Sequence, residues 1–426
     1  MSNQLPDGWR IRKLGSTIDV LISGQSPNRK EFPARAGEYG ILKTTAIDWG
    51  HFKPHCNQEV LNDFKPNLKH EVVSDDILIT KAGPVHRVGV VAHVKSTPSK
   101  ILVSGKMTLM RVKKEYLSCF IAYALSTEYS QKPLKDGTTG MASSQTNFTH
   151  DVLKEIPIFV PTDKNEQQKI AAILTSVDDV IEKTQTQINK LKDLKTGMMQ
   201  ELLTRGVGVD GKPHTEFKDS PVGRIPKGWD VVTLKNITNR ITDGTHQSVK
   251  TSDDGVHPFL YVSCIKKGQI QWEKASYLSH DEYEKASKGR KPIIGDILYS
   301  AVGSYGNAAV VTKKLEFSFQ RHIAYIQPNN TIIDSFFLAE YLNSQIGKKQ
   351  ADFYAIGNAQ LSVTLGDLGK FQILLPTLVE QRKIVSLINS IDLKICCAEE
   401  KNAKNKAIKK ALMQDLLTGK VRVNVD

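Results

Sequence analysis

The polar residues best suited to bind a ligand lie in glycine-punctuated loops that follow apolar, β-like runs. Residues 81–89 (KAGPVHRVG) follow the run Ile77 to Thr80, and residues 301–307 (AVGSYGN) follow the run Ile297 to Ser300. Loops carried by a rigid sheet are a frequent location of binding residues. Arginine can bind guanine and asparagine can bind adenine through paired hydrogen bonds. Both loops are therefore candidates for contact with phosphates or base edges.

Two further polar loops have the same character, residues 24–30 (GQSPNRK) and residues 243–247 (DGTHQ). The competing interpretation of each residue is an ordinary solvated loop. The candidate contacts from all these segments, with two basic neighbours, are Gln25, Asn28, Arg29, Lys30, Lys81, His86, Arg87, Lys106, Thr245, His246, Gln247, Ser304, Tyr305, Asn307 and Arg321.

No motif in the chain predicts catalysis. The sequence contains no GxxxxGK[ST] phosphate loop, no HExxH zinc motif, and no Asn/Asp-Pro-Pro-aromatic tetrad of the amino-methyltransferases. Asp75, Asp76 and Asp296 could be metal ligands of a nuclease, but no Glu-x-Lys lies nearby, and strand-entry turns explain them better. The histidines between positions 51 and 93 are too irregularly spaced for a metal site, and the five cysteines include no CxxC.

The composition of the chain favours a polyanionic partner. The chain has 426 residues, enough for two or three domains, and a formal net charge of +13. Such a balance favours contact with phosphates, although a basic enzyme of another kind would share it. No apolar run is long enough to span a membrane, and no signal peptide precedes residue 10, so we expect a cytoplasmic protein without membrane contact.

The sequence contains a long internal repeat. Residues 5–9 (LPDGW) recur as 225–229 (IPKGW), and residues 166–170 (EQQKI) recur as 380–384 (EQRKI). A period above 200 residues is far longer than that of a solenoid, so it indicates a duplicated domain. Such a chain approximates a symmetric dimer in one polypeptide, which suits a two-part target.

Each copy ends in a segment with apolar residues at alternating spacings of four and three, typical of a coiled-coil seam. Each segment predicts a helix of roughly 55 to 60 Å. An antiparallel pair of these helices would set Thr184 near Asn402. The apolar seam consists of Ile170, Leu174, Val177, Ile181, Ile188, Leu191, Met198 and Leu202 in the first helix, and of Ile384, Ile388, Ile391, Ile395, Leu412 and Leu416 in the second.

The predicted fold class is α+β, because each globular part mixes short β-like runs with one shorter helix and lacks strict βαβ alternation. The two mixed domains are separated by two long helices that form an antiparallel coiled coil, with a pseudo-twofold internal repeat. The predicted parts are domain 1 (1–164), helix 1 (165–205), a linker (206–224), domain 2 (225–378) and helix 2 (379–420).

The duplicated order of motifs resembles the specificity (S) subunit of type I restriction-modification enzymes. Its components are two Pro-x-Gly-Trp starts, two Glu-Gln-x-x-Ile helix starts, and two helix ends, MQELLT at 199–204 and MQDLLT at 413–418. The resemblance covers essentially the whole chain. It implies two target recognition domains, each reading one half of a bipartite DNA sequence across a nonspecific gap.

The resemblance also implies partners and leaves this chain non-catalytic. The implied partners are double-stranded DNA, two methyltransferase (M) subunits and, in the full complex, restriction (R) subunits. S-adenosylmethionine, ATP and Mg²⁺ are expected on those subunits and no cofactor on this chain. The helices would act as a ruler, so inserting four residues near Thr204 is expected to lengthen the gap. The alternatives are a stand-alone site-specific nuclease and a scaffold protein with no DNA role.

Overall fold

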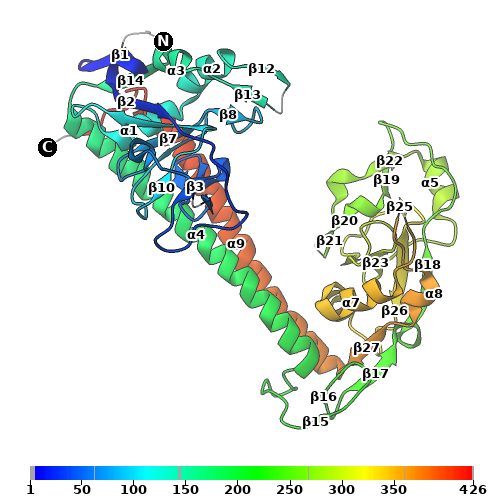
Figure 1. The fold of residues 1–426 in the computed structure, drawn as a ribbon. Helices are drawn as coiled ribbons and strands as arrows, with labels where there is room; N and C mark the ends of the chain where they lie inside the picture. Colours follow the sequence, from blue (N-terminus) through cyan, green and yellow to red (C-terminus); the bar gives the residue numbers. More distant parts are fainter. Residues whose placement is uncertain (1–4, 62, 143–144, 267, 359, 425–426) are drawn as a thin grey trace. The chain divides into compact units, whose positions relative to one another are not determined.

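The fold is described from a computed structural model, which covers residues 5–61, 63–142, 145–266, 268–358 and 360–424 (Figure 1). The chain divides into two compact units. Unit 1 comprises Met1–Thr186 and Glu399–Asp426, and unit 2 comprises Gln187–Ala398. Each unit therefore combines one globular part with half of each long helix, a division that cuts across the sequential domains predicted above.

A four-stranded antiparallel sheet forms the centre of unit 1. Its strand order is β2 (Ile18–Ser23), β11 (Met107–Val112), β7 (Ile77–Thr80) and β9 (Val91–His93). All four residues of β7 are buried, which explains why this strand is an uninterrupted apolar run in the sequence.

Smaller elements complete unit 1. The antiparallel pair β1 (Trp9–Lys13) and β14 (Pro157–Pro161) joins the start of the domain to its end. A second sheet has the order β10 (Ile101–Leu102), β3 (Gly40–Leu42), β6 (Asn57–Glu59). The other elements are β4 (Ile47–Asp48), β5 (His51–Phe52), β8 (Ala82–Gly83), β12 (Thr139–Ala142), β13 (Gln145–Asn147), α1 (Ser118–Leu125), α2 (Glu128–Asp136) and α3 (His150–Glu155).

Unit 2 repeats this plan. Its main sheet has the order β18 (Thr238–Asp243), β26 (Ile323–Pro328), β23 (Ile297–Ser300), β24 (Ala308–Val310). The pair β17 (Asp230–Thr233) and β27 (Gln372–Leu375) corresponds to β1 and β14. The other elements are β15 (Phe217–Lys218), β16 (Ile225–Pro226), β19 (His257–Leu260), β20 (Ile265–Lys266), β21 (Gln269–Ile270), β22 (Ser276–Leu278), β25 (Ser318–Phe319), α5 (His280–Ser287), α6 (Ser335–Asn343), α7 (Gln345–Tyr354) and α8 (Leu365–Gly369).

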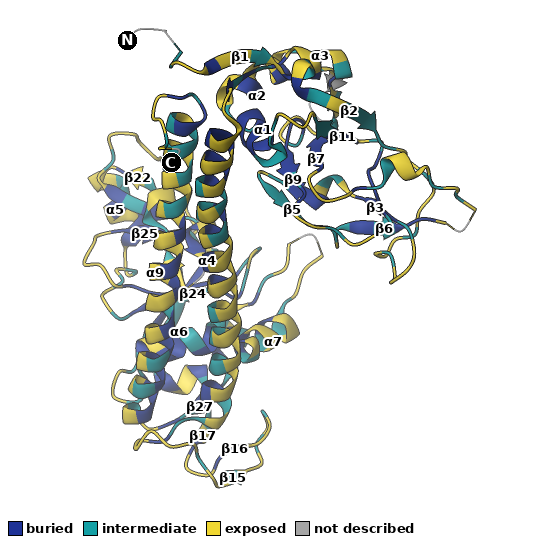
Figure 2. Cartoon of the chain, turned by 90° about the vertical axis from the view of Figure 1, so that its left-hand side faces the viewer, coloured by how far each residue is buried: buried dark blue, intermediate teal, exposed yellow. Residues whose placement is uncertain are grey.

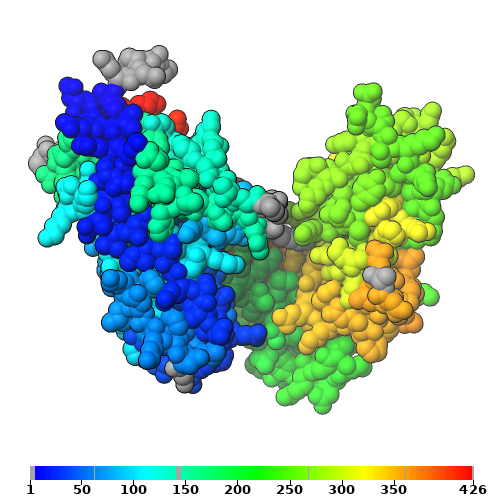
Figure 3. Space-filling model, turned by 45° about the horizontal axis from the view of Figure 1, so that its top comes forward, coloured from blue at the N-terminus to red at the C-terminus, as the bar shows by residue number. Residues whose placement is uncertain are grey.

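The fold of each unit is mixed α and β, as predicted. In unit 2 the segment before β23 and the helices α7 and α8 cover separate parts of the surface, in green and orange shades of the space-filling view (Figure 3). Two of the predicted β-like runs are not continuous strands. The run from Ile101 to Val112 becomes β10 and β11, because Gly105 and Lys106 form a turn between them. The run from Phe259 to Cys264 ends in a short 3-10 helix.

The two long helices are α4 (Lys164–Arg205) and α9 (Leu378–Leu416). The halves that belong to one unit pack on each other, and the predicted seam residues are buried or half-buried. In unit 1, Ile170 and Leu174 are fully buried, and in unit 2 Ile384 and Ile388 are. In Figure 2 the two helices carry buried and half-buried residues, in dark blue and teal, beside exposed residues in yellow.

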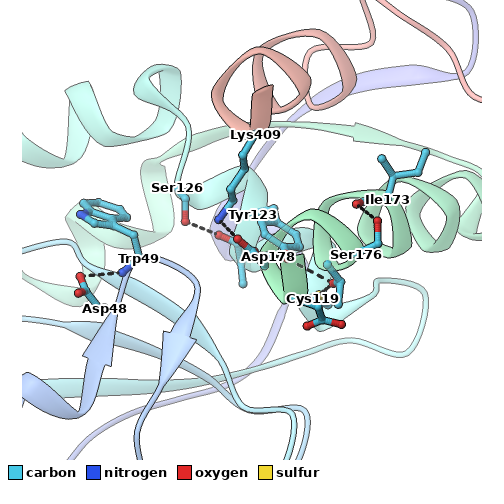
Figure 4. A network of polar contacts seen from close by, with 12 residues as sticks. Asp48, Trp49, Cys119, Tyr123, Ser126, Ile173, Ser176, Asp178 and Lys409 are labelled. Atoms are coloured by element: carbon cyan, nitrogen blue, oxygen red, sulfur yellow. Dashed lines mark hydrogen bonds and ion pairs between the residues drawn. The ribbon is translucent and has the colours of Figure 1, made fainter. Parts of the chain in front are cut away.

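Polar seam positions are occupied by one ion pair in each unit. In unit 1, Lys409 Nζ lies 2.6 Å from Asp178 Oδ1 (Figure 4). In unit 2, Lys195 Nζ lies 2.6 Å from Asp392 Oδ2. Asp178 and Asp392 are equivalent in the repeat, as are Lys195 and Lys409, so each pair joins the first half of one helix to the second half of the other. Such a reciprocal pairing forms only in the antiparallel arrangement, and it fixes the register.

Thr184 and Asn402, which the sequence predicts to lie near each other, make no direct hydrogen bond that the structure records. Both side chains are buried in unit 1, but Asn402 Nδ2 donates to Gln185 Oε1 at 3.0 Å, while the Thr184 hydroxyl donates to the carbonyl of Val180 in its own helix. A threonine hydroxyl commonly bonds back to the preceding helical turn in this way. The amide pair, rather than the threonine, therefore forms the cross-helix polar contact.

A buried glutamate fastens each globular part to both helices. Glu380, at the start of α9, accepts hydrogen bonds from the indole of Trp229 at 3.0 Å and from the backbone N–H groups of Val207 and Gly208, which follow α4. Gly206 has φ +68°, and a Cβ there would lie within the contact distance of Glu380 and Trp229, so only glycine fits.

The same contact recurs in unit 1 with one different partner. Glu166 accepts from the indole of Trp9 at 3.3 Å and from Arg422 at 2.6 and 2.9 Å, whereas His214 bonds Glu380 in unit 2. The neighbouring glutamine is equally specific, because Gln167 accepts from the N–H of Leu117 and donates to the carbonyl of Pro161. These contacts give the repeated Glu-Gln and Gly-Trp motifs a structural role.

Within the part of the chain that is described, no helix has the length and apolar content needed to cross a membrane.

We predict that the two ion pairs differ in their contribution to stability. Asp178 and Lys409 have side-chain exposures of 8% and 16%, against 41% and 24% for Asp392 and Lys195. Asp178→Asn leaves a buried lysine without its counter-charge and should lower the free energy of unfolding by about 3 kcal/mol. Asp392→Asn, the matched control, should cost about 1 kcal/mol or less. Urea unfolding measures both, and equal losses would contradict the argument.

Unit 2 contains a pH-dependent group next to its ion pair. When α1 and α6 are aligned on Ser118 and Ser335, Glu340 occupies the position of Tyr123. Burial raises the pKa of Glu340 above 4.5, although the nearby Lys195 lowers it and Asp392 raises it further. Because the folded-state pKa is raised, the stabilisation from the neutral carboxyl is complete below pH 4.5 and is lost as the pH rises through the raised pKa.

Glu340→Gln should remove this loss, since the amide stays neutral at every pH. We expect the stability of the variant relative to the unsubstituted chain to increase as the pH rises from about 4.5 to neutrality, measured by urea unfolding at several pH values. Glu182→Gln, at an exposed position of α4, is the control and should show no such trend. A difference that is independent of pH would refute the assignment.

Candidate nucleic-acid interface

The strand register brings the candidate residues of unit 1 to one end of the main sheet. Ser23, the last residue of β2, pairs with Thr108, and Thr80, the last residue of β7, pairs with Met107. The loops after β2, after β7 and before β11 therefore meet. Backbone hydrogen bonds connect them, from Gly105 N to Gln25 O at 2.7 Å and from Lys81 N to the carbonyl of Lys106 at 2.8 Å. We call this edge the reading end of unit 1.

Unit 2 has an equivalent reading end. Asp243 at the end of β18 pairs with Ala324, and Ser300 at the end of β23 pairs with Ile323. The loops that contain residues 243–247, 301–307 and 320–322 therefore adjoin, and Arg321 N donates to the carbonyl of Thr245 at 3.1 Å. Candidates that are up to 76 residues apart in sequence, Thr245 and Arg321, thus lie next to each other.

A glycine permits the close approach of the loops in each unit. A Cβ on Gly24 would lie 2.0 Å from the carbonyl oxygen of Val103, and a Cβ on Gly244 would lie 2.2 Å from the carbonyl oxygen of Phe319. Neither distance is compatible with any side chain, because backbone atoms cannot move away cheaply. Gly24 and Gly244 are therefore fixed by packing at the reading end.

Eight candidate side chains are exposed and have no hydrogen-bond or ion-pair partner among the described residues. They are available to an incoming ligand at no cost of breaking an internal contact. These side chains are Gln25, Asn28, Arg29, His86, Lys106, Gln247, Ser304 and Arg321.

Two basic candidates of unit 1 are used inside the protein. Arg87 donates from Nη2 to the carbonyls of Thr44 at 2.8 Å and Ile47 at 2.5 Å, and its side chain is 23% exposed. Lys30 pairs with the fully buried Glu59 at 2.5 Å. Both cations fasten neighbouring segments together, so a role in contacting phosphate would compete with these bonds.

Glu59 is held as a carboxylate by its partners. Hydrogen bonds from Arg35 and then from Lys30 lower the pKa of Glu59 from 4.5 to about 2. Arg35 reaches Glu59 with Nε at 3.0 Å and Nη2 at 2.9 Å, a bidentate contact. The sequence did not single out Arg35 or Glu59, because they are 24 residues apart and belong to no motif.

Lys81 lies in a small polar cluster of the reading end of unit 1. Its Nζ donates to Ser23 Oγ at 3.1 Å, and Ser23 Oγ lies 2.9 Å from His150 Nε2. Burial, then the charges of Lys81 and Lys154, lower the pKa of His150. His150 is 127 residues from Ser23, so no spacing in the sequence could have indicated this contact.

The remaining candidates of unit 2 stabilise their own loops. Thr245 is only 6% exposed, and its hydroxyl accepts from the N–H of Gln247, so this side chain forms the turn instead of facing outward. His246 Nε2 lies 2.6 Å from Asp243. Asn307 donates to the carbonyl of Ser304 at 2.9 Å.

Tyr305 stands at the edge of the same loop. Its hydroxyl donates to Asp352 Oδ1 at 2.9 Å, which raises the pKa of Tyr305, and Lys348 Nζ lies 3.9 Å from the centre of its ring. The aromatic ring and the lysine together form a small cation–π contact at the loop surface.

The aspartates that might have indicated a nuclease have structural roles. Asp76 accepts from the N–H of Val73 at 2.8 Å and pairs with Arg111 at 2.7 Å, and Asp296 accepts from the N–H of Ile293 and from the hydroxyl of Tyr325. These are the turns at the opposite end of β7 and β23. Among the described residues, no group of three or more His, Cys, Asp or Glu side chains could hold a metal ion.

Comparison with known proteins identifies the duplicated plan. The family described as "Type I restriction modification DNA specificity domain" matches residues 6–193 and again residues 226–410. The chain belongs to the type I restriction-modification specificity family. It contains two tandem DNA specificity domains, and its relatives are the specificity subunits of these systems, which are non-catalytic.

One relative matches along nearly its whole length and another over a part of it. The type I restriction enzyme MjaVIII specificity subunit of Methanocaldococcus jannaschii is 28% identical over 443 residues, covering 99% of this chain and 94% of that protein. The EcoEI specificity subunit of Escherichia coli is 31% identical over 172 residues, covering 40% of this chain and 29% of that protein.

The fold is also that of solved members. The crystal structure of the type I restriction-modification S subunit from M. genitalium superposes with a TM-score of 0.58 at 16% identity, covering 98% of this chain and 97% of that chain. A chain from a structure described as the basis of complex assembly and conformational transition of the type I system gives 0.59 at 18% identity, covering 99% of this chain and 100% of that one. These likenesses support the fold of a specificity subunit.

We predict that Gly244→Ala impairs reading by the second specificity domain. The added methyl group would meet the carbonyl oxygens of Phe319 and Gln320 at 2.2 and 2.4 Å, which forces the loops apart at a cost of about 1 to 3 kcal/mol. DNA affinity should fall at least tenfold, measured by fluorescence anisotropy at fixed salt. Gly366→Ala is the control, since its nearest neighbour is 3.8 Å away. Unchanged affinity of the first variant would exclude a role for this edge.

Proposed function

We propose that the chain recognises a bipartite double-stranded DNA sequence, with one reading end on each half-site. The observation that carries the proposal is the recurrence of the same sheet edge, with different exposed side chains, in two domains of one polypeptide. Lysines and arginines would position the duplex through its phosphates, and a few loop side chains would discriminate bases. Different side chains on a common framework would give the two half-sites different sequences.

The exposed candidates suit this division of labour. Arg29, Lys106 and Arg321 have no ion-pair partner among the described residues and can bind phosphate or the O6 and N7 atoms of guanine. Asn28 and Gln25 can bind adenine in the major groove. Their freedom from internal partners supports the assignment, because no contact must be broken on binding.

We propose that two methyltransferase subunits bind this chain and methylate adenines with S-adenosylmethionine, and that restriction subunits use ATP and Mg²⁺ in the full complex. The family membership supports these partners. This chain would contribute only recognition and spacing. The comparisons give no support to the stand-alone nuclease.

The direct test is expression of the chain with its methyltransferase subunit in a methylation-free host, followed by single-molecule sequencing of modified adenines. We expect a split motif with half-sites about one helical turn apart, centre to centre. Methylation of a continuous motif would refute the bipartite reading. Metal-dependent cleavage by the purified chain would instead support the nuclease, and absence of salt-sensitive duplex binding would support the scaffold.

The helices provide the proposed spacing, and the structure changes the best place to alter it. An insertion near Thr204 would fall beside the buried Leu203 and just before Gly206, which lies against Glu380 and Trp229. Such an insertion would disturb unit 2 itself. The suitable positions are near the midpoints of the helices, because the division between the two compact units falls after Thr186 in α4 and after Ala398 in α9.

We predict that seven residues inserted after Thr186 and seven after Ala398 lengthen the gap and leave both half-sites unchanged. One heptad preserves the seam and adds roughly 10 Å, which corresponds on distance alone to about 3 bp. Sequencing of the methylated motif measures the gap. The same insertion in α9 alone is the control, and it should abolish methylation because the helices lose their register. An unchanged gap in the double variant would refute the ruler.

A further inference from the structure

Unit 1 contains a groove that includes none of the candidate contacts of the reading end. It has a volume of about 950 Å³ and lies between the α1–α2 segment, the C-terminal part of α9 and the turn between β4 and β5. This size is within the range of pockets that hold a ligand the size of a nucleotide. The groove adjoins the far end of the loop 81–89, because Gln131 in its lining donates to the carbonyl of Gly89 at 3.0 Å, but none of the candidate contacts of the reading end lines it.

Five lysines line this groove against two carboxylates. Lys132 and Lys135 come from α2, and the lysines of α9 are Lys406, Lys409 and Lys410, whereas the carboxylates are Glu128 and Asp136. Lys409 is already paired with Asp178. The other four are exposed and form no ion pair with any part of the chain that the structure describes. A cluster of unpaired ammonium groups attracts an anion.

Aromatic side chains accompany the lysines. Trp49 lines the groove with 39% of its surface exposed, and Tyr129 lines it with 41% exposed. Trp49 is held by the β4–β5 turn, where its N–H donates to Asp48 Oδ1 at 3.0 Å (Figure 4). Exposed aromatic rings next to basic groups bind a base by stacking while the cations bind phosphate.

The base of the groove is preorganised. The hydroxyl of Tyr123 donates to Asp178 Oδ2 at 2.8 Å, and Lys409 Nζ lies 5.5 Å from the centre of the Tyr123 ring (Figure 4). Gly50, with φ +77°, lies directly against this pair, since a Cβ there would lie 3.5 Å from Asp178 Oδ2 and from Lys409 Nζ. Lys409 is therefore fixed in place, while the four other lysines of the groove remain free to adjust to a ligand.

The lysines of the groove recur only in part at the equivalent positions of unit 2. Lys349, Lys192 and Lys195 correspond to Lys132, Lys406 and Lys409, whereas Asp352 replaces Lys135, Thr196 replaces Lys410, and Glu340 replaces Tyr123. Unit 1 therefore has two more lysines at these positions and lacks two carboxyl groups that unit 2 has, so its groove is the more favourable one for an anion.

We propose that this groove binds a nucleoside phosphate, with its phosphates on the lysines of α2 and α9 and its base against Trp49 or Tyr129. The same chemistry is offered by a free nucleotide and by the backbone of a nucleic-acid strand. The second source rests on the proposed DNA recognition, and the first does not. The aromatic rings favour either source over an acidic peptide, which has no base to stack.

The tryptophans allow a direct measurement on the full-length chain. Of the four, Trp9 and Trp229 are buried and Trp272 is half-buried, so Trp49 is the most exposed. Addition of ATP without metal should quench tryptophan fluorescence, and Trp49→Phe should remove most of the quenching. Isothermal titration calorimetry should still detect ATP with this variant, because the phosphate contacts remain.

The lysines are tested with a charge-matched control. The triple variant Lys132→Ala, Lys406→Ala, Lys410→Ala should weaken ATP binding at least tenfold. The triple variant Lys183→Ala, Lys401→Ala, Lys404→Ala removes the same charge from exposed positions of α4 and α9 outside the groove and should leave binding within twofold. Circular dichroism verifies that both variants are folded.

Binding of ATP, of a 30-bp duplex and of a deca-glutamate peptide distinguishes a free nucleotide, a nucleic-acid strand and an acidic peptide as the ligand. ATP binding that depends on the groove lysines, with unchanged affinity for a 30-bp duplex, identifies a free nucleotide. If the unsubstituted chain does not bind ATP, and the groove variant but not the control variant loses affinity for the duplex, the ligand is the phosphate backbone of DNA. In that case methylation of the same motif at a reduced level shows that base recognition is intact. Binding of a deca-glutamate peptide with the same lysine dependence, and of neither phosphate ligand, would overturn the proposal, as would identical behaviour of the two triple variants with all probes.

Discussion

The hydrogen bonds accepted by Glu166 and Glu380 are the contacts on which the rest of the structure depends. Each buried carboxylate joins three segments that are distant in the chain: the start of a globular part through Trp9 or Trp229, the start of one helix, and the residues that follow the other helix. A carboxylate removed from water requires such donors. A unit is therefore complete only when both helices are present, which explains why the compact units exchange helix halves.

The polar residues in the helix seam follow from the same requirement. Lys195 and Lys409 interrupt the heptad pattern, and each has an aspartate of the opposite helix as its partner. Apolar seams tolerate shifts by one heptad, whereas a buried lysine is stable only opposite its carboxylate. The ion pairs thus determine register, and the isoleucines and leucines supply most of the burial.

Periodicity in the sequence was sufficient to predict the duplicated α+β plan and the long helices, because the repeated motifs and the seam are local patterns. It could not predict contacts between distant segments. The loop sequence makes Thr245 and Arg87 candidate DNA contacts, yet the Thr245 hydroxyl is buried in a turn and Arg87 is bonded to backbone carbonyls. Trp49 and the lysines of the groove belong to no motif, since three separate segments form that surface. The register of β2, β7 and β11 is what brings the loops together.

The reading ends contain two kinds of position, glycines that packing fixes and exposed side chains that packing leaves free to vary. Gly24 and Gly244 are fixed because backbone atoms of another loop lie within 2.5 Å of any Cβ at these positions. The exposed side chains beside them, such as those of Gln25 and Gln247, form no hydrogen bond or ion pair with the part of the chain that the structure describes, so replacing them should change stability little. Since the glycines that hold the loops together and the exposed side chains are separate groups, substitution of the exposed residues leaves the loop packing and the helix register in place.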